Sequence, residues 1–333
     1  RFFKFNYPHE KINMYNIGII DKINLKGLEI FKKNNNFKFE VVTDLSKENL
    51  LKKIPEFDGI TLRRGKINSE ILSKCKKLKV ISRHGVGYDN VDIDFIKKKN
   101  IKLLVTNSST STSPAEHIMY MILSIYKGVN FFDSMVREGN FSKAINLDIN
   151  QNFELFNKKI LVFGFGRIGK KLIKKCLGFD MIVNVFDPFV DEKIIKSFGG
   201  EKVLDFKESL KDTDILSLSL PLNDKTYNLI SLNEMKLMKK NSIIINVSRG
   251  GIVNEKDLDF ALKKKIISYA GIDVFEKEPP DESNPLLVNK RVLLSPHAAT
   301  FTKECLENMS IETVKNIINF FENTIDKSKI VSL

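Results

Sequence analysis

The sequence predicts an α/β fold with two doubly wound parallel sheets, and three observations carry that prediction. Apolar strand-like runs alternate with amphipathic helical runs from Met14 to about Asn107, the same alternation restarts at Lys158, and the 333 residues are enough for two cores of ordinary size. Parallel strands need helical crossovers between them, so this alternation favours two α/β domains over a single β-rich one.

The first half of the chain accounts for one sheet. Residues 1–13 show no clear periodicity, and we expect them to be an N-terminal extension outside the fold. The strand-like runs that follow are YNIGIID (15–21), FKFEVVTD (37–44), DGITLRR (58–64), LKVISRHGVG (78–87) and IKLLVTN (101–107), and the helical runs between them include 28–33, 48–53 and 90–100. Together they predict five strands with helices between them.

A Ser/Thr-rich loop, NSSTSTS, separates the two halves and leads into a long, mostly apolar helix. Ser113 fits an N-cap, Pro114 the first helical position and Glu116 the third, which is the pattern of a capping box. We therefore expect the helix to begin at Ser113 and the preceding loop to serve as a hinge.

The second half restarts with KKILVFGFGRIGKK, in which a strand runs into three glycines at 164, 166 and 169. Gly164 permits a tight turn, Gly166 lets a pyrophosphate approach the backbone, and Gly169 allows close helix–strand packing. A second strand ends at Asp187, an acid placed to accept hydrogen bonds from ribose hydroxyls and to repel a 2′-phosphate, so NAD is favoured over NADP. Further strand-like runs are 202–206, 214–222, 241–251, 267–275 and 291–298.

Composition excludes several classes of function. The net charge of +13 comes from lysines spread along the whole chain, which indicates no nucleic-acid partner. Cys75, Cys176 and Cys305 show no paired spacing, so we expect no metal site and a reducing, cytoplasmic compartment. The longest strongly apolar run, 118–126, is half the length of a membrane span, so no membrane association is expected.

Three side chains late in the sequence could together bind an anion and transfer a proton. His297 follows a strand and could accept or return a proton, since imidazole titrates near neutral pH. Glu278 could stabilise the imidazolium, and Arg249 could bind a carboxylate. Each residue alone is also compatible with an ordinary structural role; all three at strand ends of one sheet favour a site.

The motifs RHGVGYDNVD, GFGRIGK, FDP, INVSRGGIV, GIDVFEKEPP and LLSPHAA occur in the order and approximate spacing of the D-isomer-specific 2-hydroxyacid dehydrogenases. The chain resembles this family from about Gly18 to its end. Within the family it looks most similar to D-3-phosphoglycerate dehydrogenases without a C-terminal regulatory domain. The resemblance implies a Rossmann domain, residues 109–298, inserted into a flavodoxin-like substrate-binding lid, residues 14–108 and 299–330.

The resemblance also assigns the site residues. It places Arg249, Glu278 and His297 in catalysis and implies a substrate site at Arg63 and at the backbone of Val86 and Gly87. His84 and His117 are expected beside the site without a catalytic role. The positions it assigns to NAD binding are Gly164, Gly166, Arg167, Ile168, Gly169, Asp187, Pro221, Val247 and Asp273.

The function implied is NAD-dependent interconversion of a small anionic D-2-hydroxy acid and its 2-keto acid. The expected substrate is 3-phospho-D-glycerate, oxidised to 3-phosphohydroxypyruvate in serine biosynthesis, because Arg63 could bind a phosphate. Ala299 and Phe301 stand where phosphoglycerate dehydrogenases typically carry Gly and Ser/Thr, so glyoxylate or hydroxypyruvate reduction remains an alternative. A non-catalytic NAD-sensing protein is a further alternative.

The helix from Ser113 and its extension through Phe141 resemble the family's dimer arm, which implies a homodimer.

Overall fold

The computed structural model describes residues 14–108, 110–147 and 152–332, and the predicted N-terminal extension lies outside these ranges. The chain divides into two compact units, Arg1–Thr110 with Thr302–Leu333, and Ser111–Phe301. The predicted domains, 14–108 with 299–330 and 109–298, stay a prediction. Each unit is described here by itself.

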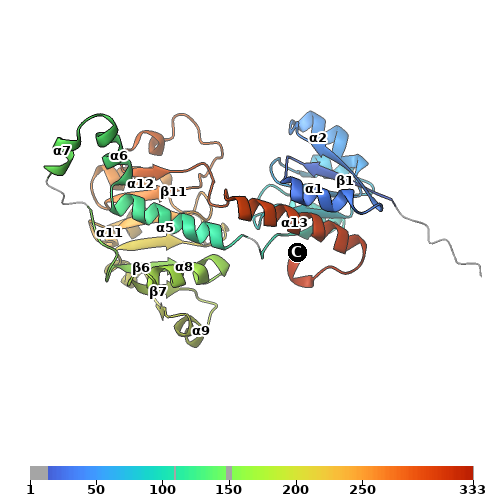
Figure 1. Cartoon of the computed structure of the whole chain (residues 1–333). Coiled ribbons are helices and arrows are strands. Elements are labelled where there is room, and N and C mark those ends of the chain that lie inside the picture. The colour runs from blue at the N-terminus through green and yellow to red at the C-terminus, as the bar shows by residue number, and fades with distance from the viewer. Residues whose placement is uncertain (1–13, 109, 148–151, 333) are drawn as a thin grey trace, which may run out of the picture. The chain divides into compact units, whose positions relative to one another are not determined.

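The first unit is a five-stranded parallel sheet with strand order β2-β1-β3-β4-β5, the flavodoxin-like order. Helices α1 and α13 pack side by side over the sheet (Figure 1). The elements of this unit are β1 (Tyr15–Ile20), α1 (Leu25–Lys32), β2 (Phe37–Val42), α2 (Lys47–Lys53), the 3₁₀ helix η1 (Ile54–Glu56), β3 (Gly59–Leu62), α3 (Ser69–Lys74), β4 (Val80–Arg83), α4 (Ile93–Lys98), β5 (Lys102–Leu104), α13 (Lys303–Phe321) and η3 (Lys327–Lys329).

The second unit is a seven-stranded parallel sheet with strand order β12-β11-β10-β9-β6-β7-β8. Counted from β6, this is the Rossmann order extended by a seventh strand, so the predicted fold class is confirmed. Its elements are α5 (Thr112–Tyr126), α6 (Val129–Arg137), α7 (Phe141–Ile145), β6 (Lys159–Phe163), α8 (Arg167–Leu177), β7 (Ile182–Phe186), α9 (Glu192–Ser197), β8 (Glu201–Lys202), α10 (Phe206–Leu210), β9 (Ile215–Leu218), α11 (Leu232–Leu237), β10 (Ile243–Asn246), α12 (Glu255–Lys263), β11 (Tyr269–Ile272), η2 (Pro285–Val288) and β12 (Val292–Leu294).

Alternate residues of the central strands fill two separate cores, one on each face of the second sheet. Ile160 and Val162 of β6 pack with α5 and α8 on one face, whereas Leu161 and Phe163 pack on the opposite face with α11 and α12. Figure 1 shows α5 and α8 among the helices that cover this sheet. Because both faces are buried, the central strands β6, β9 and β10 are mostly apolar.

Two local predictions are wrong. Helix α5 begins at Thr112 with Ser111 as N-cap, and Ser113 lies inside the helix, where its hydroxyl donates a 2.6 Å hydrogen bond to the carbonyl of Ala299. Glu116 forms an ion pair with Lys175 of α8 and caps nothing. The predicted strand 202–206 is the two-residue strand β8, and Asp205 caps α10 instead.

Candidate active site

The glycine turn after β6 has the geometry that a bound pyrophosphate requires. Gly164 adopts φ +101°, and a side chain on Gly169 would come within 2.2 Å of the Gly164 carbonyl oxygen, so neither position accepts a larger residue without distortion. A Cβ on Gly166 would meet nothing within 4 Å. Helix α8 begins at the next residue, Arg167, and no side chain caps it. Its N-terminus therefore faces open space suited to an anion.

Asp187 follows β7 and lies beside this turn. Its Oδ2 accepts a hydrogen bond from the amide of Phe165, at 2.9 Å, and its Oδ1 accepts one from the amide of Phe189, at 3.0 Å. The carboxylate is thereby fixed against the glycine loop, where both oxygens retain lone pairs for further donors.

Glu278 and His297 are in direct contact. Nδ1 of His297 lies 2.8 Å from Oε2 of Glu278, and because a carboxylate can only accept, Nδ1 carries the hydrogen and Nε2 is left for a ligand. The other Glu278 oxygen accepts a hydrogen bond from the amide of Phe275, at 3.1 Å. Both side chains are partly exposed, so a small molecule can reach the imidazole.

The pair shifts the titration of both groups. The hydrogen bond that His297 donates to Glu278 raises the pKa of His297 above its usual 6.5, against the opposing effects of burial and of the Arg249 charge. Burial raises the pKa of Glu278, but the hydrogen bond and charge of His297, with the charge of Arg249, bring that pKa below its usual value. The three predicted catalytic residues therefore lie close enough to act on one another electrostatically.

Arg249 is positioned by the loop that follows β10. Its Nη1 donates to the Ser248 carbonyl at 2.7 Å, and its own carbonyl accepts a hydrogen bond from Asn246 at the end of the strand. The adjacent Gly250 has no room for a side chain, since a Cβ would lie 1.9 Å from the Phe275 carbonyl oxygen. This close backbone approach brings the loop after β10 against the loop that contains Glu278.

All the predicted catalytic and NAD-binding residues of the second unit follow the carboxyl ends of strands in one sheet, where doubly wound folds bind ligands. The glycine turn follows β6, Asp187 follows β7, Pro221 follows β9, Val247 and Arg249 follow β10, Asp273 and Glu278 follow β11, and His297 follows β12. Val247 is buried and Pro221 is exposed.

Asp273 is buried completely, and its carboxylate accepts hydrogen bonds from Ser295 Oγ and from the amides of Ala298 and Ala299. No local sequence pattern indicates that Asp273 holds the loop of His297 in this way. His117 lies next to it, with Nε2 3.0 Å from Ser295 Oγ. The assignment of Asp273 to NAD binding stays a prediction.

The predicted residues of the first unit also lie at the carboxyl ends of strands, and the structure separates two neighbouring arginines that look alike in the sequence. Arg64 makes two hydrogen bonds to the buried carboxylate of Asp21, at 2.6 and 3.1 Å. Arg63 approaches Asp21 only to 3.7 Å and donates one long bond to the Lys22 carbonyl. Arg63 therefore makes fewer hydrogen bonds than Arg64 to the described residues, although 27% of its side chain is exposed against 70% for Arg64.

The loop after β4 exposes backbone donors. Gly85 adopts φ +140°, and the amides of Val86 and Gly87 donate no hydrogen bond to any residue that the structure describes. Arg83 fixes this loop, because its Nε donates to the Gly87 carbonyl at 2.6 Å. Its Nη1 donates to the carbonyls of Leu62 and Arg63, which ties the loop to the end of β3.

His84 is nearly buried and its Nε2 has no hydrogen-bond partner among the described residues. Burial, helped by the charges of Arg63 and Arg83, lowers its pKa to about 4, so the ring is neutral at physiological pH.

In the described part of the chain, no group of His, Cys, Asp and Glu side chains is arranged to bind a metal ion. The helices described there are all too short or too polar to cross a lipid bilayer.

Comparison with known proteins agrees with this arrangement. Residues 119–299 match the family model of the D-isomer specific 2-hydroxyacid dehydrogenase NAD binding domain. A D-3-phosphoglycerate dehydrogenase of Methanocaldococcus jannaschii is 35% identical over 87% of this chain and 56% of its own length. A glyoxylate reductase of Thermococcus litoralis is 35% identical over 83% of this chain and 84% of its own. The chain belongs to the D-isomer specific 2-hydroxyacid dehydrogenase family.

Among solved structures, an NAD-dependent formate dehydrogenase of Staphylococcus aureus in complex with NAD superposes with a TM-score of 0.84 at 25% identity, over 96% of this chain and 99% of the other. The chain spans a little over half the length of the phosphoglycerate dehydrogenases it matches first, 56% in each of two archaeal proteins.

The coupling between Glu278 and His297 predicts a measurable titration. In the wild-type protein the Cε1–H resonance of His297 should titrate above pH 6.5, and in Glu278→Gln its midpoint should move to lower pH because the stabilising charge is lost. His84, with a pKa of about 4, provides an internal reference below this range. Assignment uses His297→Gln, and equal midpoints in wild type and Glu278→Gln would contradict the coupling.

Proposed function

We propose that the protein is an NAD-dependent oxidoreductase that transfers a hydride between nicotinamide and the C2 carbon of a D-2-hydroxy acid or its 2-keto acid. The observation that carries this proposal is the hydrogen-bonded pair of Glu278 and His297, whose pKa values respond to the charge of Arg249. The pair follows strands of the same sheet whose carboxyl ends carry the glycine turn and Asp187. Membership of the family supports the reaction class.

The residues present fit NAD. The open space at Gly166 and the uncapped N-terminus of α8 would hold the pyrophosphate, with the backbone of Arg167 and Ile168 facing it. Asp187 would bind the ribose hydroxyls and disfavour a 2′-phosphate. Gly164 and Gly169 keep the turn tight, and Pro221, Val247 and Asp273 follow strands that end near the nicotinamide half. When bound, NAD supplies the hydride acceptor, or NADH the donor.

The chain's own residues perform the proton transfer. In oxidation, neutral His297 removes the hydroxyl proton through Nε2, and in reduction the imidazolium returns it to the same oxygen. Glu278 holds the ring by its Nδ1–H and stabilises the charged form. Arg249 binds the substrate carboxylate and polarises the keto oxygen, because its guanidinium stays charged at every working pH.

We assign cofactor binding to the second unit and further substrate contacts to the first. The amides of Val86 and Gly87 would receive a carboxylate, since they are exposed donors on a rigid loop. The chain passes between the units twice, at residues 110–111 and 301–302, and these crossings are the proposed hinge. Three free cysteines are consistent with a reducing, cytoplasmic location.

The preferred substrate is 3-phospho-D-glycerate, the hydroxy acid oxidised at the start of serine biosynthesis. Arg63 supports this choice because, unlike Arg64, it is not held by a bidentate pair and could bind a phosphate. Glyoxylate or hydroxypyruvate reduction is the second candidate, supported by Ala299 and Phe301 and by similarity to proteins named for those activities.

A panel of acids tests the reaction class. Wild-type protein should oxidise phosphoglycerate with NAD in steady state, and His297→Ala should lower kcat by about 10²- to 10⁴-fold, the usual contribution of a general acid–base. NAD affinity, measured by calorimetry, should be unchanged in the variant. If wild-type protein binds NAD but turns over none of phosphoglycerate, glyoxylate, hydroxypyruvate or lactate, in either direction, a non-catalytic NAD sensor becomes the better account.

Arg63→Ala tests the substrate. Loss of a charge-assisted hydrogen bond worth about 1.5–3 kcal/mol should raise KM for phosphoglycerate by roughly 10- to 100-fold and leave KM for glyoxylate unchanged. Lys66→Ala, a charge removal at an exposed position three residues away, is the matched control. An equal KM for phosphoglycerate in wild type and Arg63→Ala would refute the phosphate site.

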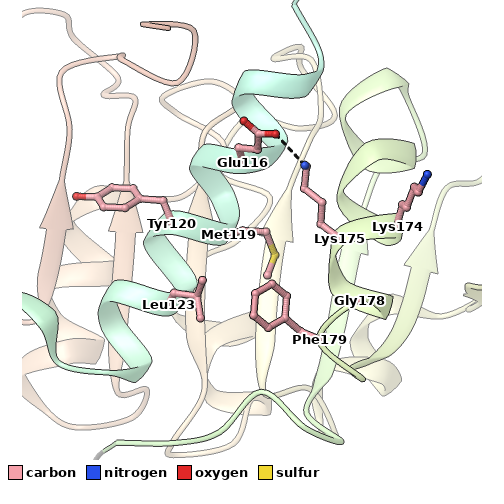
Figure 2. A pocket seen from close by; sticks show the side chains of 8 residues that line it. All are labelled: Glu116, Met119, Tyr120, Leu123, Lys174, Lys175, Gly178 and Phe179. Carbon is pink, nitrogen blue, oxygen red and sulfur yellow. Dashed lines mark hydrogen bonds and ion pairs between the residues drawn. The ribbon is translucent and has the colours of Figure 1, made fainter.

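We also propose a homodimer formed through α5–α7 and α8. Helices α6 and α7 expose Val129, Phe131, Val136, Phe141 and Ile145. Beside them, a shallow hollow of about 420 Å³ lies between α5 and α8, and its apolar lining includes Met119, Tyr120, Leu123 and Phe179. Figure 2 shows Met119, Leu123 and Phe179 between the two helices, with the Tyr120 ring extending to the other side of α5. Apolar side chains in such number on neighbouring helices are typical of a surface that is covered in the assembled protein.

Substitution on this surface tests the dimer. Wild-type protein should have twice the 38.2 kDa mass of one chain by light scattering, and the double variant Phe131→Glu/Phe141→Glu should have the mass of one, because it places two charges in an apolar contact. Leu204→Glu, at a position that is 86% exposed in a loop outside the surface, is the control and should remain dimeric. A monomeric wild type would refute the proposal.

A further inference from the structure

A buried polar network lies directly behind the loop of His297. The side chain of Asp273 is fully buried, and it accepts hydrogen bonds from Ser295 Oγ at 2.5 Å and the Ala298 amide at 2.7 Å on Oδ1, and from the Ala299 amide at 3.0 Å on Oδ2. A buried carboxylate keeps its charge only where donors compensate for lost water, so these bonds are strong constraints on the loop.

The same aspartate holds the backbone of His297. The His297 amide donates a 2.7 Å hydrogen bond to the Asp273 carbonyl, and His297 adopts φ +52°. A residue other than glycine in this left-handed region persists only where surrounding contacts hold it. Asp273 supplies such contacts through its carbonyl at residue 297 and its carboxylate at residues 298 and 299.

Helix α5 enters this network through His117. Its Nε2 lies 3.0 Å from Ser295 Oγ and 3.5 Å from Asp273 Oδ1. The single hydroxyl hydrogen of Ser295 is donated to Asp273, so the Ser295 oxygen must accept a hydrogen from His117 Nε2. Burial lowers the pKa of His117, against the opposing charge of Asp273, so the donor is the neutral Nε2–H tautomer.

We infer that His117 is a positioning residue for His297: its Nε2–H fixes the Ser295 hydroxyl, which fixes the Asp273 carboxylate and with it the backbone of the His297 loop. The inference rests on the proposed function of His297 and extends it to a residue on another element.

The hydrogen bonds of this network indicate what the loss of the His117 donor would do. Without the Nε2–H donor the Ser295 hydroxyl loses the partner that fixes its rotamer, and a buried carboxylate loses part of the field that stabilises it. The loop then leaves its left-handed conformation more often, and the imidazole of His297 points less often at both Glu278 and the substrate. The proton transfer slows, whereas cofactor and substrate binding change little.

Three variants test the inference. His117→Phe keeps a planar ring and removes the donor, His117→Gln keeps an N–H near the position of Nε2, and Ser295→Ala removes the next link. We expect His117→Phe and Ser295→Ala to lower kcat about tenfold or more with KM values within about threefold of wild type. His117→Gln should restore most of kcat. Tyr126→Phe, another buried aromatic on α5, should behave as wild type.

The outcomes are distinct. Wild-type kcat in both His117→Phe and Ser295→Ala overturns the inference, as does equal impairment of His117→Gln and His117→Phe, which would show that ring volume alone matters. The Cε1–H titration of His297 provides a readout independent of turnover, and its midpoint should differ between wild type and His117→Phe. If the wild-type protein proves inactive on every acid, the proposed function fails, and this titration still decides whether His117 positions His297.

Discussion

The hydrogen bond between Glu278 and His297 is the interaction on which the site depends. It fixes which imidazole nitrogen is left for a ligand, raises the pKa of the ring, and joins the loops after β11 and β12. The charge of Arg249 acts on the pKa of both groups from the loop after β10. Three consecutive strands at one end of the sheet thus contribute the three groups proposed for proton transfer and carboxylate binding, and β6 and β7 contribute the proposed cofactor turn and its acid.

The fold produces this convergence by separating stability from chemistry. Alternate side chains of the central strands are buried in two cores, one on each face, so the sheet is rigid. The polar residues that follow each strand are therefore held in fixed positions. Close backbone approaches complete the arrangement. Gly169 packs against the Gly164 carbonyl, and Gly250 packs against that of Phe275, where any side chain would force the loops apart. The position of Arg249 relative to Glu278 is therefore set by a contact between backbones.

Much of this was accessible from the sequence, and the reasons for the failures are physical. Strand–helix alternation and the glycine spacing predicted both sheets, because those patterns reflect periodic burial and local turn geometry. The N-cap was wrongly placed at Ser113 because its hydroxyl is used by the Ala299 carbonyl, 186 residues away. The same limitation hid the link from His117 to Ser295 and the difference between Arg63 and Arg64, which depends on the buried carboxylate of Asp21. Hydrogen bonds between distant segments leave no local pattern.

The pH dependence of turnover in the two directions tests the central claim most directly. If the Glu278–His297 pair carries the proton, reduction requires the imidazolium and falls as pH rises, whereas oxidation requires the neutral ring and rises. When kcat/KM is measured against pH, the fall for reduction and the rise for oxidation should share one midpoint above pH 6.5, and Glu278→Gln should move both midpoints to lower pH together. Different midpoints for the two directions, or a midpoint that Glu278→Gln leaves in place, would contradict the account.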